Sequence, residues 1–174
     1  TAVVITPWYH MVTSTAWMLP HLQAGARLVL HTGFTPHETL QAIEGHGVTG
    51  LLAVPTQLTQ VVDAQIDGDY DLSTLSYIRT GGSVVTETLA ERASQHLTPE
   101  VHNTYGMTEA GANMTHAYPE EQDGRYGTIG KSTFMWDLRV VTAVDPDDTP
   151  DPEAEVDPGE TGEILVRGPA QPQG

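Results

Sequence analysis

Five consecutive positions, Tyr105 to Glu109, bring together an aromatic ring, a flexible turn residue, a hydroxyl group and a carboxylate. The Tyr105 ring can offer a flat apolar face to a purine, and the Thr108 hydroxyl can donate a hydrogen bond to a phosphate oxygen. The Glu109 carboxylate is the kind of ligand that Mg²⁺ prefers when it bridges a protein to a phosphate. Gly106 lets the backbone take conformations closed to other residues. The segment therefore has the parts of a site for a nucleotide and magnesium.

A purely structural interpretation of the same residues competes with this one. Tyr105 can be a half-buried strand aromatic, and Thr108 with Glu109 can simply begin a helix. For each residue taken alone, that interpretation holds about two times in three. The ordered set Tyr-Gly-x-Thr-Glu is rarer, because average residue usage produces it by chance in roughly one chain in a thousand of this length. The order of the residues, more than any one of them, favours a site.

The chain before this segment alternates between strand and helix patterns. Apolar runs predict strands, and apolar residues at helical spacing predict helices between them. The predicted strands are 2–5, 27–31, 48–54, 75–79 and 101–105, and the predicted helices are 11–22, 35–45, 55–66 and 86–97. This alternation indicates an α/β fold with a parallel sheet flanked by helices on both faces and right-handed connections. Ligand groups then collect at the carboxyl ends of the strands, which here carry Trp8–His10, Gly81–Ser83 and Tyr105–Glu109.

After about residue 130 the pattern changes to strands without an intervening helix. Residues 138–144 and 162–167 have strand patterns, and the stretch 145–158 between them is rich in Asp, Glu and Pro, which indicates a solvated loop. We therefore expect an α/β subdomain over residues 1–134 that carries the candidate site segments. A truncated β-rich segment over residues 135–174 should follow, as the start of an antiparallel sheet or small barrel.

Composition excludes several classes of protein. The 174 residues hold 23 acidic residues against 7 Lys plus Arg, and Lys131 is the only lysine, so the net charge is −16. Such a surface repels nucleic acid and anionic membranes, and we expect neither as a partner. The chain has no cysteine, no bilayer-spanning apolar stretch and no signal-peptide pattern, so we expect a cytoplasmic protein without disulfides. The acid excess predicts a halophilic source, where salt screens self-repulsion.

The segment Asn103-Thr104-Tyr105-Gly106-Met107-Thr108-Glu109 resembles a signature of the adenylate-forming superfamily. That superfamily includes acyl-CoA synthetases, aryl-CoA ligases, firefly luciferase and the adenylation domains of nonribosomal peptide synthetases. Four further segments are similar to family patterns in the same order and spacing. They are Pro7-Trp8-Tyr9-His10, Gly81-Gly82-Ser83, the turn Gly127-Thr128-Ile129-Gly130-Lys131 and the strand region from Gly159 to Pro169. The resemblance covers nearly all of the chain.

The resemblance implies a role for each residue of the signature. Tyr105 stacks on adenine, Asn103 hydrogen-bonds the adenine amino group, Thr108 contacts the α-phosphate and Glu109 holds Mg²⁺. Further nucleotide-binding positions are Gly81, Gly82, Ser83, Thr104, Gly106 and Met107, and the acid pocket is shaped by His10 and Met11. Four other residues, which can either extend an apolar pocket or belong to the core, are Trp8, Trp17, Val84 and Val85.

The reaction implied by the resemblance has two steps. A small-molecule carboxylic acid attacks the α-phosphate of ATP to give an acyl-adenylate and pyrophosphate, and the thiol of CoA then takes the acyl group. The family's phosphate-binding loop, ribose-binding Asp and C-terminal domain with its catalytic Lys have no counterpart here. We therefore expect an internal fragment of the large N-terminal domain that is inactive alone. Two alternatives stay open: an adenylation domain that loads a carrier protein, and a non-catalytic nucleotide-binding module.

Overall fold

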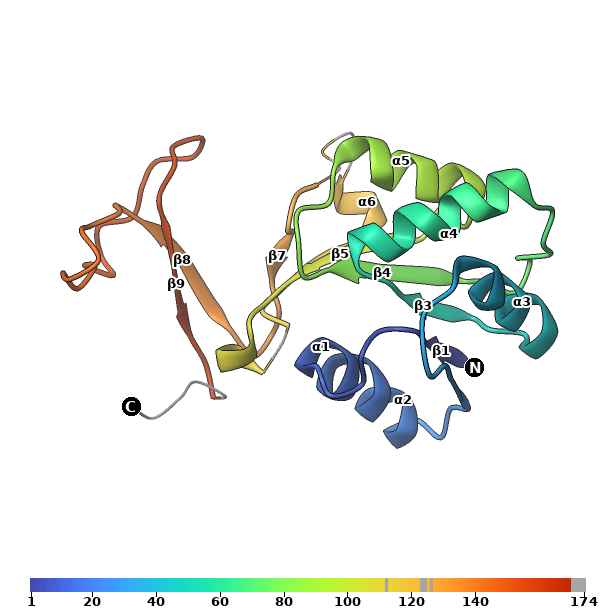
Figure 1. The fold of residues 1–174 in the computed structure, drawn as a ribbon. Coiled ribbons are helices and arrows are strands. Elements are labelled where there is room, and N and C mark those ends of the chain that lie inside the picture. The colour runs from blue at the N-terminus through green and yellow to red at the C-terminus, as the bar shows by residue number, and fades with distance from the viewer. Residues whose placement is uncertain (112, 123–124, 126, 170–174) are drawn as a thin grey trace.

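A seven-stranded sheet forms the main body of the protein in the computed structural model, which describes residues 1–111, 113–122, 125 and 127–169 (Figure 1). The order of the strands is β2-β1-β3-β4-β5-β6-β7, and the first five are parallel. Their bounds are Ala2–Val4 (β1), Leu28–Leu30 (β2), Gly50–Leu52 (β3), Tyr77–Gly81 (β4), Val101–Tyr105 (β5), Thr115–Ala117 (β6) and Lys131–Ser132 (β7). The predicted parallel sheet flanked by helices is confirmed. The antiparallel pairing of β6 and β7 at one edge was not predicted.

Three helices cover one face of this sheet: α3 (Pro36–His46), α4 (Pro55–Asp67) and α5 (Glu87–His96) (Figure 1). α3 and α4 begin with proline, whose fixed φ suits the first helical turn. The Thr86 hydroxyl caps α5 by accepting a hydrogen bond from the Leu89 amide at 3.3 Å. The helices bury a continuous aliphatic core against the strands, which includes Val3, Leu40, Ile43, Leu51, Leu58, Val61, Val62 and Ile78.

Helical spacing predicts that Leu58, Val61, Val62 and Ile66 lie roughly on one apolar face of α4, but the Ile66 side chain is 47% exposed. Eight residues at about 100° each place it about 80° around the helix from Leu58. The fully buried stripe runs from Val61, about 60° to one side of Leu58, to Val62, about 40° to the other, so Ile66 lies beyond its edge. A position at the margin of a helical stripe therefore reaches solvent even when it has an apolar side chain.

The opposite face is covered by one continuous helical segment, although the structure divides it into three parts. These are α1 (Met11–Thr13), the π-helix η1 (Ser14–Met18) and α2 (Leu19–Gln23). The predicted helix 11–22 is confirmed in extent, while its π-helical centre was not foreseen. Trp17 lies in η1, is 1% exposed and donates from Nε1 to the Val3 carbonyl at 3.0 Å. The segment is thereby fixed to the sheet beside the carboxyl ends of the strands.

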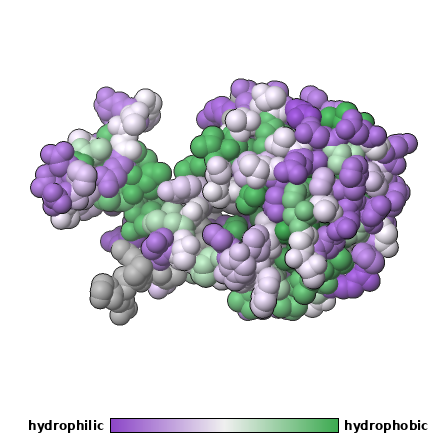
Figure 2. Space-filling view, viewed as in Figure 1, coloured by the Kyte–Doolittle hydropathy of each residue, from purple (hydrophilic) through white to green (hydrophobic). Residues whose placement is uncertain are grey.

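A separate two-stranded antiparallel sheet, β8 (Asp137–Val141) and β9 (Glu163–Arg167), stands beside the main body (Figure 1). Leu138 and Val166 pack with Ala110, Met114 and Trp136, which ties this sheet to the end of β5. Apolar surface gathers where the two parts meet (Figure 2). The connection over residues 145–158 is mostly exposed, as its composition predicts.

None of the helices in the described part of the chain is long and apolar enough to cross a membrane.

Candidate functional site

A cavity of about 420 Å³ opens at the carboxyl ends of the parallel strands. One wall follows β1 and consists of Thr6, Pro7 and residues 10–13, and a second comes from Val54 and Gln57 at the start of α4. The cavity is also lined by Gly82 after β4, by Thr104, Gly106, Met107, Thr108 and Glu109 at the end of β5, and by Asn113 beyond them. The strand tips that carry the predicted ligand groups therefore share one cleft, of a volume usual for small-molecule sites.

Most of the predicted site residues are in the wall of this cavity. They are His10, Met11, Gly82, Thr104, Gly106, Met107, Thr108 and Glu109. Four predicted residues lie next to these in the chain but outside the cavity wall: Gly81, Ser83, Asn103 and Tyr105. The cavity therefore unites the acid-pocket residues after β1 with the hydroxyl and carboxylate after β5.

Thr108 and Glu109 are held at the cavity by a single turn of 3₁₀ helix, η2 (Thr108–Ala110). Gly111 ends this turn with φ at 67°, in the left-handed region. Ala110 is 3% exposed and packs with Met114 and Trp136, whereas Thr108 and Glu109 are exposed. One buried alanine thus anchors the turn and leaves the hydroxyl and the carboxylate free to face a ligand.

Asn103 lies inside the sheet layer at 5% exposure. Its Nδ2 donates to the Thr128 carbonyl at 2.8 Å, and the Thr128 hydroxyl accepts from the Gly130 amide at 3.2 Å. The turn Gly127–Lys131 is thereby fixed against β5. Among the residues that the structure describes, none donates a hydrogen bond to Asn103 Oδ1, which is an acceptor.

Tyr105 is half-buried at the end of β5, where it pairs with Thr115 of β6. Its ring packs at the edge of the cluster formed by Ala110, Met114 and Trp136. The ring is therefore supported on its inner side by apolar side chains and is not sealed inside the protein.

Of the four residues that could either extend an apolar pocket or belong to the core, two are buried and two are exposed. Trp17 and Val85 are buried at 1% and 4% exposure, and neither lines the cavity. Trp8 and Val84 point to solvent at 69% and 83% exposure. Met11 is the one apolar residue of the predicted pocket that lines the cavity.

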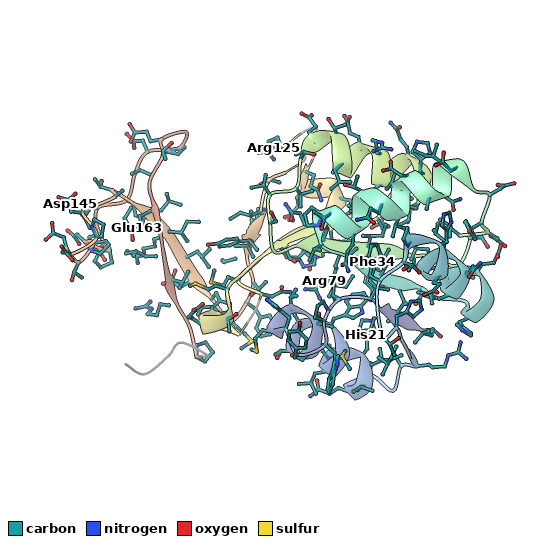
Figure 3. All side chains as sticks on the ribbon, in the orientation of Figure 1. His21, Phe34, Arg79, Arg125, Asp145 and Glu163 are labelled. Carbon is teal, nitrogen blue, oxygen red and sulfur yellow. The ribbon has the colours of Figure 1, made fainter. Side chains whose placement is uncertain are left out.

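A second polar cluster lies on the sheet face that carries α1 and α2, and sequence reasoning missed it. His102 Nδ1 and His116 Nε2 are 2.9 Å apart, and the His116 ring stacks on Tyr118 at 4.3 Å between centroids. The Arg79 guanidinium lies between the sheet and the helix, where Nη1 donates to the Ala16 carbonyl at 2.7 Å (Figure 3). The available signal was the polar or aromatic residues at alternate positions of β4, Tyr77 and Arg79, which lie on one face of the sheet.

Burial is the main reason why the histidines of this cluster stay neutral. Desolvation, with smaller contributions from the positive charge of Arg79 and from the neighbouring His102, lowers the pKa of His116 to about 4. Burial also lowers the pKa of His102, against the opposing effect of Glu100. The cluster is thus a neutral aromatic layer with one cation beside it.

Comparison with known proteins finds relatives along the whole chain. The profile of a family described as AMP-binding enzyme matches residues 1–174. Indoleacetate–CoA ligase of Aromatoleum aromaticum is 35% identical over 163 residues, which is 94% of this chain and 30% of that protein. The structure of a long-chain-fatty-acid–CoA ligase from Archaeoglobus fulgidus has a TM-score of 0.83 at 26% identity and covers 99% of this chain and 35% of that one.

A solved structure with bound nucleotide has the same fold. O-succinylbenzoate coenzyme A synthetase from Bacillus subtilis, in complex with ATP and magnesium ion, has a TM-score of 0.79 at 25% identity, over 99% of this chain and 33% of that one. The present chain thus spans about a third of the length of the proteins that it resembles.

Proposed function

Because the chain belongs to the family of AMP-binding enzymes, we propose that it is part of the large domain of an ATP-dependent acyl-CoA synthetase. The whole protein would activate a carboxylic acid as an acyl-adenylate and transfer the acyl group to CoA. The observation that carries this proposal is the cavity at the strand tips. It joins His10 and Met11, on the side proposed for the acid, to Thr108 and Glu109, on the side proposed for the phosphates.

In the first step a carboxylate oxygen of the acid attacks the α-phosphorus of ATP, and the bond to the bridging oxygen breaks, so that pyrophosphate leaves. In the second step the CoA sulfur attacks the acyl carbon, its proton is lost, and AMP leaves. None of the cavity residues needs to act as a nucleophile. The contribution of this chain is to position the reactants and to stabilise charge at the phosphoryl group.

Nucleotide binding in this proposal uses the end of β5. The half-buried ring of Tyr105 is supported from behind by Met114 and Trp136, which suits a platform for adenine. The hydrogen bond from Asn103 Nδ2 to Thr128 orients the amide so that Oδ1 is the atom left to accept from the adenine amino group. The Thr108 hydroxyl is exposed in the cavity wall and would donate to the α-phosphate.

The donor chemistry at Glu109 fits a magnesium ion. Its carboxylate is exposed in the cavity wall, and Mg²⁺ is commonly held by one or two carboxylates together with substrate phosphates. When bound with ATP, the ion would supply charge neutralisation at the phosphates. Glu109 would hold it beside the hydroxyl of Thr108.

CoA is the acceptor that the relatives support, because the three described above are named as CoA ligases or synthetases. The division into an α/β subdomain over residues 1–134 and a β-rich segment over 135–174 is part of the proposal, as is a cytoplasmic location. The separate pairing of β8 with β9 supports that division.

The direct test is exchange of labelled pyrophosphate into ATP by the full-length protein, followed by CoA consumption. We expect exchange that depends on both magnesium and an added carboxylic acid, and acyl-CoA formation when CoA is supplied. Acid-dependent exchange without any use of CoA would instead indicate loading of a carrier protein. Tight ATP binding with no exchange for any acid would reject the ligase proposal in favour of a nucleotide-binding module.

A further inference from the structure

The helical segment of residues 11–23 contains a carbonyl group whose usual helical partner is missing. In an α-helix the Ala16 carbonyl would accept a hydrogen bond from the residue four positions later, which is Pro20. Proline has no N–H group, and in a regular helix its ring crowds that same carbonyl. The wider π-helical turn η1 ends at Met18, two residues before Pro20. The sequence thus leaves the Ala16 carbonyl without its α-helical donor.

Arg79 of β4 supplies a donor to this carbonyl from outside the helix, because its side chain points from the sheet toward the helical segment (Figure 3). Arg79 Nη1 donates to the Ala16 carbonyl at 2.7 Å, a distance typical of strong hydrogen bonds from a charged donor. The guanidinium carbon also lies 5.9 Å from the centre of the Trp17 ring, within the range of a cation–π contact. Both contacts join β4 to η1.

The position of Arg79 connects two walls of the cavity. Residues 10–13, in the wall on the proposed acid side, come directly before η1 in the chain. Gly82, in another wall, follows Arg79 by three residues, just after the end of β4. The hydrogen bond between Arg79 and Ala16 therefore sets how far the acid-side wall stands from the tip of β4.

The phosphate side of the cavity has an anchor of its own. Thr108 and Glu109 lie on the turn η2, which is held by the buried Ala110 in the cluster with Met114 and Trp136. None of these residues belongs to the helical segment of residues 11–23. A change at Arg79 should therefore displace the acid side of the cavity and leave the phosphate side in place.

The environment of Arg79 indicates a role other than general stability. Among the described residues it forms no ion pair, and its Nε and Nη2 atoms are buried without a hydrogen-bond partner. Burial accordingly lowers the pKa of the Arg79 guanidinium. A buried cation without a carboxylate costs free energy, so an apolar side chain of similar length at this position need not destabilise the fold.

We propose that Arg79 is a positioning residue, which holds the helical segment of residues 11–23 at the distance from the sheet that the acid side of the cavity requires. The inference rests on the proposed function, because that function defines the acid side. Arg79 does not itself line the cavity. It acts through α1, whose residues Met11 and Val12 do line it.

The first test measures KM values for pyrophosphate exchange by the full-length protein, with whichever of hexanoate, phenylacetate and benzoate it uses best. In Arg79→Met the KM for the acid should rise about tenfold or more, because a small displacement of a positioning wall is costly. The KM for ATP should stay nearly unchanged. Arg79→Lys keeps a charged donor and should recover part of the lost acid affinity. An equal rise in both KM values, or no rise for the acid, overturns the inference.

The matched control is Arg92→Met, which removes an arginine from α5 on the opposite face of the sheet, outside the cavity. Arg92 pairs with Asp63 at 2.6 Å, so this variant also loses a contact between elements. Both KM values should nevertheless equal those of the unchanged protein. A rise in the KM for the acid as large as that of Arg79→Met would show that the effect is not specific to the Arg79–Ala16 hydrogen bond.

A double-mutant cycle with Pro20 tests the hydrogen bond itself. Pro20→Ala restores an N–H group four residues after Ala16, at an exposed position. The helix can then supply its own donor to the Ala16 carbonyl, so Arg79→Met should raise the KM for the acid less in this background than in the unchanged protein. An equal rise in both backgrounds would show that the Ala16 carbonyl does not carry the effect.

Hydrogen exchange of backbone amides tests the position of the segment without any reaction. In full-length Arg79→Met the amides of residues 11–23 should exchange faster than in the unchanged protein, while those of α3, on the other face of the sheet, keep their rates. If none of the three acids supports pyrophosphate exchange, the ligase proposal fails and this measurement still decides the role of Arg79. Unchanged protection of residues 11–23 overturns the inference and leaves the ligase proposal standing.

Discussion

Gly81 of β4 pairs with Thr104 of β5, and the carbonyl oxygen of Thr104 occupies the space that a Cβ on Gly81 would need. The Thr104 hydroxyl also donates to the Thr80 carbonyl at 3.1 Å, so the two strands are joined by side chain as well as by backbone. This junction sets the relative position of Gly82 and Thr104, which both line the cavity. The glycine is thus required where two walls of the site meet.

Replacement of this glycine by alanine should destabilise the protein and the site together. Gly81→Ala places a methyl group against the backbone of Thr104 at a φ of 154°, and we expect a loss of about 3 kcal/mol in the free energy of unfolding. Gly82→Ala is the matched control, because its added Cβ would meet nothing closer than Val54 Cγ1 at 3.8 Å. There only the left-handed φ of 77° opposes the change, at about 1 kcal/mol. Urea unfolding of both variants measures the difference, and equal losses would contradict the contact with Thr104.

The His102–His116 pair predicts a loss of stability in mild acid. Burial holds the pKa of His116 at about 4, below its ordinary value of 6.5 in an unfolded chain. Between these values the unfolded state binds a proton that folded His116 does not, so stability falls as the pH drops through this window. Arg79 and His102 oppose protonation of His116, whereas Glu120 and Glu121 favour it with smaller effects.

A single substitution isolates this contribution. In His116→Gln the free energy of unfolding should fall less steeply between pH 6.5 and about 4 than in the unchanged protein. His96→Gln, at an exposed histidine in the last turn of α5, serves as the control for removal of one imidazole. Parallel pH profiles for the His116→Gln variant and the unchanged protein would show that the buried pair does not control acid stability.

The parallel sheet and its ligand-bearing edge could be predicted because they follow from local patterns. Apolar runs of a few residues mark strands that are buried on both faces, and the turn at Gly81–Gly82 marks a strand end. The signature from Asn103 to Glu109 then located the cavity wall. These features depend on residues that are close together in the sequence, so a local sequence pattern can predict them.

The parts that were missed depend on partners distant in the chain. β6 is only Thr115–Ala117, too short and polar to be recognised, and it is a strand because β5 offers it an edge. The sequence left open whether Trp17 lines a pocket or belongs to the core. It is a core residue because the helix that carries it packs across Ala2, Val4 and Leu52 of the sheet. The contact of Asn103 with Thr128 spans 25 residues and left no local signal.

The acidic surface predicts that salt stabilises the protein. The chain has 23 acidic residues but only 7 Lys plus Arg, and several of these cations already pair with an acid, as in Arg92–Asp63 at 2.6 Å and Lys131–Glu121 at 2.7 Å. Most of the acidic groups therefore have no cation beside them and repel one another. In about 1 M KCl the Debye length falls to about 3 Å, which screens this repulsion. Thermal unfolding should occur at a higher temperature in that salt than in dilute buffer. A double variant, Asp147→Asn with Asp148→Asn in the exposed loop, should show a weaker salt dependence, and maximal stability in dilute buffer would refute adaptation to salt.

Glu109 offers the sharpest test of the proposed chemistry. Glu109→Ala removes the carboxylate from the cavity wall but leaves Ala110, which anchors η2, in place. If the carboxylate holds magnesium at the phosphates, the variant should lose several kcal/mol of transition-state stabilisation, or about 100-fold or more in pyrophosphate exchange by the full-length protein. The magnesium concentration that gives half-maximal exchange should rise as well, which mere disturbance of the fold would not produce.

Glu91→Ala removes an exposed carboxylate from α5, outside the cavity, and should exchange like the unchanged protein. Exchange by Glu109→Ala within a few-fold of the Glu91→Ala control, at the same magnesium requirement, would assign the metal to another residue.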